Sequence, residues 1–284
     1  MNQRIGRIGQ LKVYFGKWVR LYINEGSYFN LVMTAVIMLL INAVINEDMF
    51  LKYSDTKNGG FTVVCVCIWV GLFNTIQSVC KERATIKKEH RGGMFISSYI
   101  LSKLLFEILQ SLVEALIISG FIFFKFRDNL PDDGIVTAAM ADLCFTFFMV
   151  IFSADALGLM LSSVCKTVNL AMTVMPFILI IQLVMAGCVF PLEGMTKTIS
   201  SVTISRWGLC AIGSIANQNP GIQEDIDRLN PMYKQFGLSE IELDHWDPTK
   251  KNFLFLMGIL LLFVVIYTAI SIIALNLTID KDTR

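Results

Sequence analysis

Several features that would indicate a soluble enzyme or a nucleic-acid-binding protein are missing from this sequence. No charge sign dominates, since 24 Lys and Arg stand against 23 Asp and Glu for a net charge of +1, whereas nucleic-acid binding requires a basic face. No G-x-x-x-x-G-K-[ST] motif occurs, which excludes ATP binding by this chain through a P-loop. The chain also lacks an H-E-x-x-H motif, a nucleophile elbow and paired catalytic carboxylates. We therefore expect neither an enzyme nor a cofactor bound by this chain.

Potential metal ligands are also sparse. The chain has two His, and its seven Cys include no C-x-x-C pair, so no metal site is expected. Most of the Cys lie in apolar stretches, where Cys usually serves as a small core residue. Cys188 and Cys210 are the only two that could meet on the outer side of a membrane, and a disulfide between them is left open.

Apolar residues are abundant. The chain is 55% hydrophobic and has a mean hydropathy of +0.61, far above that of an ordinary soluble domain. Six stretches reach the ~18 apolar residues that cross a ~30 Å hydrocarbon layer as a helix. We therefore predict an all-α polytopic membrane protein whose residues 1–284 form a single transmembrane domain, with spans at 28–45, 61–79, 99–124, 135–164, 170–190 and 253–275.

The basic residues of the short connecting segments predict the orientation. Segments 1–27 and 80–98 carry five Lys or Arg each, whereas 46–60 and 125–134 carry two each. Short cytoplasmic loops are the ones enriched in Lys and Arg. We therefore expect a multi-pass protein of the plasma (cell inner) membrane with both termini in the cytoplasm.

Two segments outside the spans have their own patterns. Residues 1–27 lack the apolar core of a cleavable signal peptide and place basic and apolar residues at helical spacing. This predicts an interfacial helix, with a solvated arm as the alternative. Residues 191–252 begin with a broken apolar part, which predicts re-entrant helices. They continue as an acidic extracellular cap, in which Pro220, Pro231 and Pro248 are expected to act as breaks.

The charged segment 80–98 is predicted to contain a short helix. Its charged residues recur at helical spacing between Glu82 and Arg91, and the pair Gly92–Gly93 follows as a C-terminal cap. A short charged helix between two spans provides a handle by which a soluble partner could move the membrane part.

This segment also carries a family resemblance. The pattern E-R-x5-E-x-R-G from Glu82 to Gly92, followed by SSYILSKLL, resembles the loop and third span of G-type ABC half-transporters, which belong to the ABC-2 permease class. The resemblance implies an elbow helix at 1–27 and a coupling helix that docks on an ATP-binding subunit. The implied ATPase-coupling residues are Glu82, Arg83, Lys87, Glu89 and Arg91.

The same resemblance implies how the assembly is composed. Two permease copies, identical or related, would work with two ATP-binding subunits, which would bind the ATP and Mg and drive export. In half-transporters the ATPase precedes the membrane domain on the same chain. This sequence departs from that pattern, so we expect a separate ATP-binding subunit, as well as membrane lipids and no nucleic acid among the partners.

The resemblance further places the substrate cavity where spans 2 and 5 meet their copies across a dimer axis. An apolar slot there suits a hydrophobic or amphipathic substrate such as a peptide, a lipid or glycan intermediate, or a drug. Helix packing is the alternative role for each candidate. The end of span 5 resembles an apolar plug, so Gly187, Cys188 and Val189 are the implied extracellular valve. The implied cavity residues are Cys67, Val70, Phe73, Asn74, Gln77, Pro176, Ile180, Leu183 and Val184.

Five ionisable residues fall within predicted spans, where charge is costly and usually paired or functional. Of these, Lys103 and Glu107 are expected to form an i, i+4 ion pair. Burial for structural reasons is one interpretation of the set, and an ion-coupled secondary carrier or channel is the alternative. A membrane enzyme or scaffold is a third possibility, which would need a polar cluster at one depth. The set comprises Lys103, Glu107, Glu114, Asp142 and Asp155.

Overall fold

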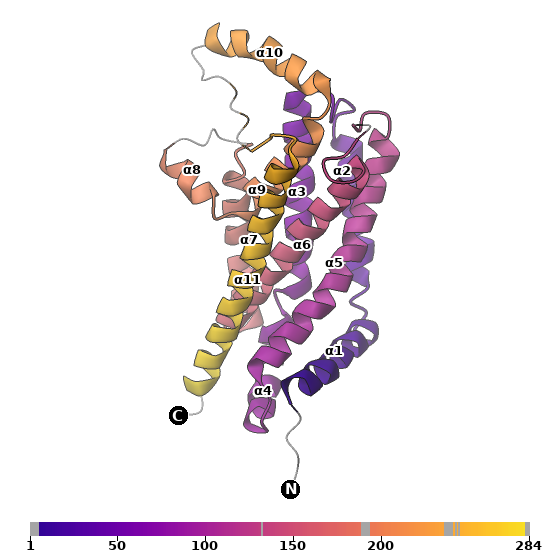
Figure 1. Cartoon of the computed structure of the whole chain (residues 1–284). Helices are drawn as coiled ribbons and strands as arrows, with labels where there is room; N and C mark the ends of the chain where they lie inside the picture. Colours follow the sequence, from indigo (N-terminus) through magenta and orange to yellow (C-terminus); the bar gives the residue numbers. More distant parts are fainter. Residues whose placement is uncertain are drawn as a thin grey trace.

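A computed structural model describes residues 6–131, 133–188, 194–235, 241, 243 and 245–281 of the chain. These residues form helices and no strand (Figure 1), so the prediction of an all-α protein is confirmed. In chain order the helices are α1 (Arg7–Asn24), α2 (Phe29–Val44), α3 (Tyr53–Thr75), α4 (Ser78–Arg91), α5 (Ile96–Phe126), α6 (Ala139–Val164), α7 (Val168–Val184), α8 (Met195–Ser200), α9 (Ile204–Ala216), α10 (Pro220–Gln235) and α11 (Lys250–Lys281).

Length and hydropathy support a polytopic membrane protein. In the described part of the chain, four helical stretches are long and apolar enough to cross a bilayer. Helices α1 and α2 qualify together as a pair bent by 64°, and α7 is a shorter apolar helix of 17 residues. Each of the six predicted spans therefore coincides with an apolar helix over most of its length, while the number of full crossings stays a prediction. The four stretches are Tyr53–Arg91, Ile96–Phe126, Ala139–Val164 and Lys250–Ile279.

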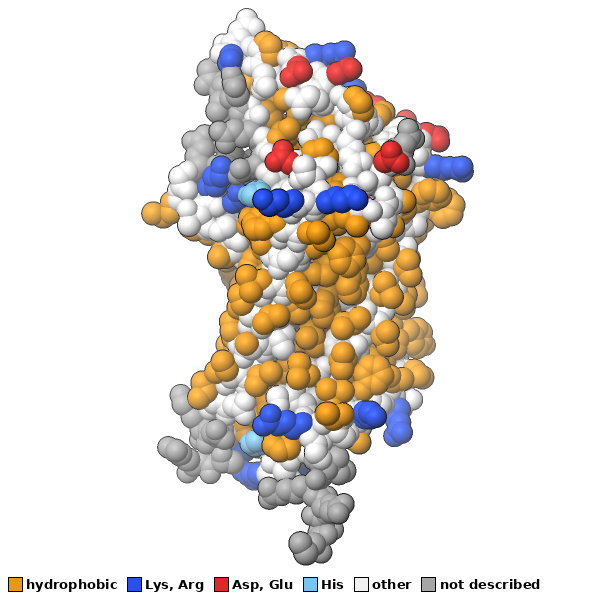
Figure 2. All heavy atoms as spheres, viewed as in Figure 1, with side chains coloured by type: hydrophobic (Ala, Val, Ile, Leu, Met, Phe, Trp, Pro, Cys, Tyr) orange, Lys and Arg blue, Asp and Glu red, His pale blue; other side chains and the backbone are white. Residues whose placement is uncertain are grey.

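The molecule is an elongated bundle with two different ends. Figure 1 shows α4, the start of α1 and the end of α11 at one end, and α10 at the other. Between them a broad hydrophobic band covers the face seen in Figure 2, and acidic side chains gather at the end that carries α10. This distribution suits a helical bundle in a bilayer, because apolar side chains can face the lipid and charged ones the water.

Helix α6 forms the centre of the bundle, packed against α3, α5 and α11. Two glycines let α3 and α6 approach closely. A β-carbon at Gly71 would lie 2.5 Å from the carbonyl oxygen of Ile151, and one at Gly158 would lie 3.0 Å from that of Leu72. Small residues at a helix–helix contact allow such close backbone approach within a membrane.

Two helices begin at other residues than the predicted spans, and in both cases a carboxylate accepts a backbone N–H near the start of the helix. Span 2 was expected at 61–79, but α3 already begins at Tyr53, whose backbone N–H donates to the carboxylate of Asp225 at 2.9 Å. Span 4 was expected to begin at 135, but α6 begins at Ala139. The residues before it are held outside the helix by Asp142, whose carboxylate accepts the backbone N–H of Val136 at 2.9 Å.

The segment after α7 was predicted to contain proline breaks and re-entrant helices. Pro231 lies inside α10 and does not break it, whereas Pro220 is the first residue of that helix, where the missing N–H costs nothing. All thirteen residues of α9 are buried, and at 1.5 Å per residue it is about 20 Å long. This helix is too short to span a bilayer, and the re-entrant arrangement of the segment stays a prediction.

Candidate functional site

The short helix predicted in the charged loop is α4, and α1 holds it from one side. The ammonium of Lys17 lies 2.8 Å from the carboxylate of Glu82, which also accepts the phenol of Tyr99 at 2.8 Å. One turn earlier on α1, the phenol of Tyr14 donates to Glu89 at 3.0 Å. Burial, and next the hydrogen bond to Glu89, raise the pKa of Tyr14. The phenol therefore keeps its proton, and continues to donate, to a higher pH than an ordinary tyrosine.

The end of α4 is also bound to α1. Helix α4 ends as predicted, at Arg91, and Gly93 follows with a φ of +100°, a conformation that favours glycine. The side chain of Gln10 donates to the carbonyl of Gly93 at 3.1 Å and accepts the backbone N–H of Phe95 at 2.9 Å. Contacts at both ends of α4 thus make α1 and α4 one mechanical unit.

Arg83 connects α4 to the other side of the bundle. Its guanidinium donates to the backbone carbonyls of Ser163 at 3.2 Å and Cys165 at 2.5 Å, at the end of α6. It also donates to the hydroxyl of Thr278 on α11 at 2.8 Å. A planar guanidinium can hold several acceptors at fixed angles, so a displacement of α4 would be transmitted to α6 and α11.

The outer face of α4 shares one residue, Arg91, with the coupling residues predicted from the sequence. Of the five predicted coupling residues, Glu82, Arg83 and Glu89 bind their own chain, Lys87 is half-buried, and Arg91 is exposed. We call the exposed stripe the outer face of α4, consisting of Lys81, Ala84, Thr85, Lys88 and Arg91.

The predicted coupling residues did not include Lys81, Ala84, Thr85 and Lys88 of this face. The signal that could have found them is their spacing of three and four residues, which places them opposite the buried Ile86.

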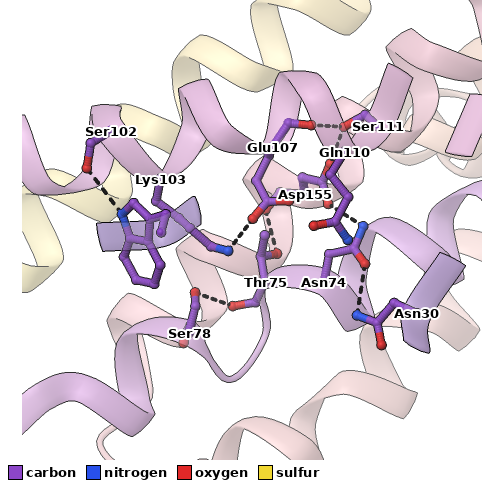
Figure 3. Close-up of polar contacts among 12 residues, drawn as sticks. Asn30, Asn74, Thr75, Ser78, Ser102, Lys103, Glu107, Gln110, Ser111 and Asp155 are labelled. Carbon is purple, nitrogen blue, oxygen red and sulfur yellow. Dashed lines mark hydrogen bonds and ion pairs between the residues drawn. The ribbon is translucent and has the colours of Figure 1, made fainter. Parts of the chain in front are cut away.

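A second group of polar residues lies inside the bundle, where α2, α3, α5 and α6 meet (Figure 3). We call Asn30, Asn74, Gln110, Ser111, Glu114 and Asp155 the amide cluster. The amide nitrogen of Asn74 donates to Glu114 at 2.9 Å and to Asp155 at 3.2 Å, and its oxygen accepts from Asn30 at 3.2 Å. Ser111 donates to the other oxygen of Asp155 at 2.6 Å. Asn74 therefore joins four helices through one side chain.

The expected pair of Lys103 and Glu107 is present beside the amide cluster, and both side chains are buried. The ammonium of Lys103 also lies 4.8 Å from the ring centroid of Trp18 and 5.1 Å from that of Phe106. Aromatic faces attract a desolvated cation. The pair thus ties α5 to α1, in addition to the contacts that α1 makes with α4.

Asp142 takes no part in this interior group. It lies at the beginning of α6 with a carboxylate occupied by the Thr137 hydroxyl at 2.8 Å and by nearby backbone N–H groups. Of the five ionisable residues singled out in the sequence, four therefore lie in the bundle interior and Asp142 lies at a helix start.

The predicted cavity residues differ in how far they are buried. Cys67 and Val70 of α3 are buried within the bundle, whereas Phe73, Pro176 and Ile180 are exposed. Asn74, Gln77, Leu183 and Val184 are half-buried, and the amide of Gln77 lies 3.3 Å from the sulfur of Met172 on α7. The exposed members form neighbouring edges of α3 and α7, which pack against each other.

The predicted valve is described only in part. Gly187 and Cys188 are half-buried after the end of α7, and Val189 lies outside the described residues. The thiol of Cys188 lies 3.3 Å from the side-chain oxygen of Asn58, and both Cys188 and the buried Cys210 are free thiols. The disulfide left open by the sequence is not formed in this structure.

Comparison with known proteins gives two findings. The family model described as ABC-2 type transporter matches residues 10–212, which is more than half of the chain. The ABC transporter ATP-binding/permease protein Rv1747 of Mycobacterium tuberculosis (strain H37Rv) is 26% identical over 204 residues. That alignment covers 70% of this chain and 22% of the relative, so the chain corresponds to about a fifth of the relative's length.

Proposed function

Because this chain belongs to the ABC-2 type transporter family, we propose that it is the permease subunit of an ATP-driven exporter. Its substrate is hydrophobic or amphipathic, such as a peptide, a lipid or glycan intermediate, or a drug. Two ATP-binding subunits carry the ATP and Mg and supply the energy, and a second permease copy, identical or related, completes the complex. The relative's name joins an ATP-binding and a permease function, which supports the ATP-binding partner.

The observation that carries this proposal is the way α4 is bound to the rest of the bundle. Its outer face is available to a partner, while its inner face is tied to α1 through Glu82 and Glu89 and to α6 and α11 through Arg83. A push on α4 from an ATP-binding subunit would therefore move α1, α6 and α11 together. This is the mechanical requirement for coupling ATP hydrolysis to rearrangement of the spans.

The substrate path in this proposal runs between two permease copies. The exposed edges of α3 and α7, with Phe73, Pro176 and Ile180, would face their copies and form an apolar slot. Cys67 and Val70, which lie inside the bundle, would shape this edge from behind and not touch the substrate. Gly187 and Cys188 with their neighbour Val189 would close the slot towards the outside.

The end of the bundle that carries α4 faces the cytoplasm in this proposal. Helices α1 and α4 carry nine of the ten basic residues of segments 1–27 and 80–98, and basic segments are retained on the cytoplasmic side. The acidic end that carries α10 would then face outwards. The membrane concerned is the plasma membrane of the cell.

The test is affinity purification of the chain from its native cell in mild detergent, with quantification of the P-loop ATPase that co-elutes. We expect one ATPase per permease, and loss of it in the variant Lys88→Glu/Arg91→Glu, which reverses two charges on the outer face of α4. The matched control is Lys250→Glu/Lys251→Glu, which reverses two exposed charges at the start of α11, at the opposite end of the bundle. Repeated purification without an ATPase would refute the proposal.

The amide cluster favours a second candidate function. Two buried carboxyl groups of the cluster, Glu114 and Asp155, lie close to a third, Glu107, which pairs with the buried ammonium of Lys103. Intramembrane carboxyls can serve as cation or proton sites, so an ion-coupled carrier is the alternative. It predicts that these residues are essential for transport while the outer face of α4 tolerates substitution.

A further inference from the structure

A wide groove lies between α5 and α6 in the half of the bundle that carries α10. Its volume is about 820 Å³, within the usual range of ligand pockets. Leu116 and Phe123 of α5 and Ala141 and Phe145 of α6 give it apolar walls. The residues of α5 that line it run from Leu112 to Phe123, which is roughly 16 Å along the helix axis. That length is about half of the ~30 Å hydrocarbon core, or the depth of one lipid leaflet.

One polar group in this groove lacks a protein partner. Ser119 is 3% exposed, and its hydroxyl makes no hydrogen bond with any residue that the structure describes. Other buried serines of the same bundle bind the carbonyl four residues earlier, as Ser111 does at 2.6 Å and Ser153 at 2.7 Å. A buried hydroxyl without a partner is costly, so the groove offers one donor to a ligand that carries an acceptor.

The groove also has open space and a cation at its mouth. A β-carbon at Gly120 would have no atom within 4 Å. The exposed Arg127 directly follows α5, about two helical turns beyond Ser119, and places its guanidinium 5.9 Å from the centroid of the Phe123 ring. The neighbouring cation Lys125 is already bound to the backbone carbonyls of Asn42 and Ile45, both at 2.5 Å. Arg127 is therefore the cation best placed to meet an anionic group at the groove.

We propose that this groove binds one phospholipid, with an acyl chain between α5 and α6, an ester carbonyl on the Ser119 hydroxyl and the phosphate on Arg127. Guanidinium and phosphate form strong charge-assisted hydrogen bonds. The apolar walls match an acyl chain. Ser119 and Arg127 are about 12 Å apart along the axis, but the Arg127 guanidinium lies 5.9 Å from the ring of Phe123, one turn beyond Ser119, which brings it towards a phosphate whose ester carbonyl is on Ser119. A transmembrane helix of another protein would satisfy the apolar walls but would not bring a phosphate to Arg127.

The test uses the full chain reconstituted in bilayer nanodiscs that contain phosphatidylglycerol with a diazirine in one acyl chain. After irradiation, mass spectrometry compares lipid adducts on groove peptides from α5 and α6 with adducts on the exposed residues Leu254 and Leu262 of α11. We expect several-fold more labelling of the groove than of α11. Equal labelling of the two would mean ordinary annular lipid or an occupant other than lipid, and would overturn the proposal.

Variants make this test specific. Gly120→Leu fills the open space and is expected to lower groove labelling at least fivefold. Gly258→Leu on α11, where a β-carbon likewise meets no atom within 4 Å, should leave it unchanged. Arg127→Glu should lower it about threefold and Ser119→Ala about twofold. If Gly120→Leu does not fold, the exposed Arg127→Glu still decides, and undiminished labelling in a folded variant of either position refutes the site.

Discussion

Lys17 and Glu82 lie 65 residues apart in the chain and meet across α1 and α4 with 2.8 Å between their charged atoms. Tyr99 donates to the same carboxylate, so the pair connects the interfacial helix, the short charged helix and the start of α5. The contact between α1 and α4 can be tested by mutagenesis, because both charges can be reversed.

We predict that Lys17→Glu and Glu82→Lys each weaken the α1–α4 contact, and that the double reversal restores it. Each single variant places two like charges together, whereas the double variant restores an opposite pair. The pair is partly exposed, so each single change should cost roughly 1 kcal/mol or less. Thermal unfolding in detergent measures the stability. Two single-variant losses that simply add in the double variant would contradict a direct interaction.

Breaking the pair of Lys103 and Glu107 should lower the stability of the protein more than breaking the pair of Lys17 and Glu82. Lys103→Met leaves the Glu107 carboxylate buried without its cation, which typically costs roughly 3–5 kcal/mol. The double variant Lys103→Met/Glu107→Met removes both charges with side chains of similar length, so much of the loss should be recovered. Thermal unfolding of the three proteins provides the measurement. A double variant no more stable than Lys103→Met would show that the ion pair is not the source of the loss.

Close packing of α3 against α6 gives a third prediction. Gly71→Ala and Gly158→Ala should each destabilise the protein by roughly 1–3 kcal/mol, because the added methyl group meets neighbouring backbone atoms. Gly120→Ala and Gly258→Ala are matched controls in open positions. They should be neutral or stabilising by up to ~1 kcal/mol through helix propensity. Equal melting temperatures in all four variants would contradict the close approach.

Asp155 separates the two candidate functions. Asp155→Asn keeps the shape of the side chain and can still bind Ser111 and Asn74 of the amide cluster, but it cannot ionise or exchange a proton. If transport is driven by ATP, this variant should retain most of its substrate-stimulated ATP hydrolysis, within about twofold. Loss of transport in a folded Asp155→Asn variant that still binds the ATPase would favour the ion-coupled carrier. Asp155→Ala, which leaves partners unsatisfied, serves as the structural control.

The helices could be predicted from the sequence because their signals are local. Apolar stretches located the long apolar helices, and the spacing of charges before Gly92–Gly93 located α4 and its end. Partners distant in the chain could not be predicted. Nothing near Glu82 in sequence indicates that Lys17 neutralises it, nor that Asn74 would bridge Glu114 and Asp155. Segments such as α6 began later than expected because Asp142 binds the preceding backbone, which hydropathy does not register.

The glycine contacts between α3 and α6 have a consequence for how the protein changes shape. Gly71 lies on the backbone of α6, and Gly158 lies on that of α3. If either helix slid by one turn past the other, a larger side chain would have to enter a space that fits only the hydrogen atom of glycine. The two helices must then tilt together as a single lever. In the proposed dimer, the displacement available to a transported molecule would be set by how far this lever rotates against the same lever of the second copy.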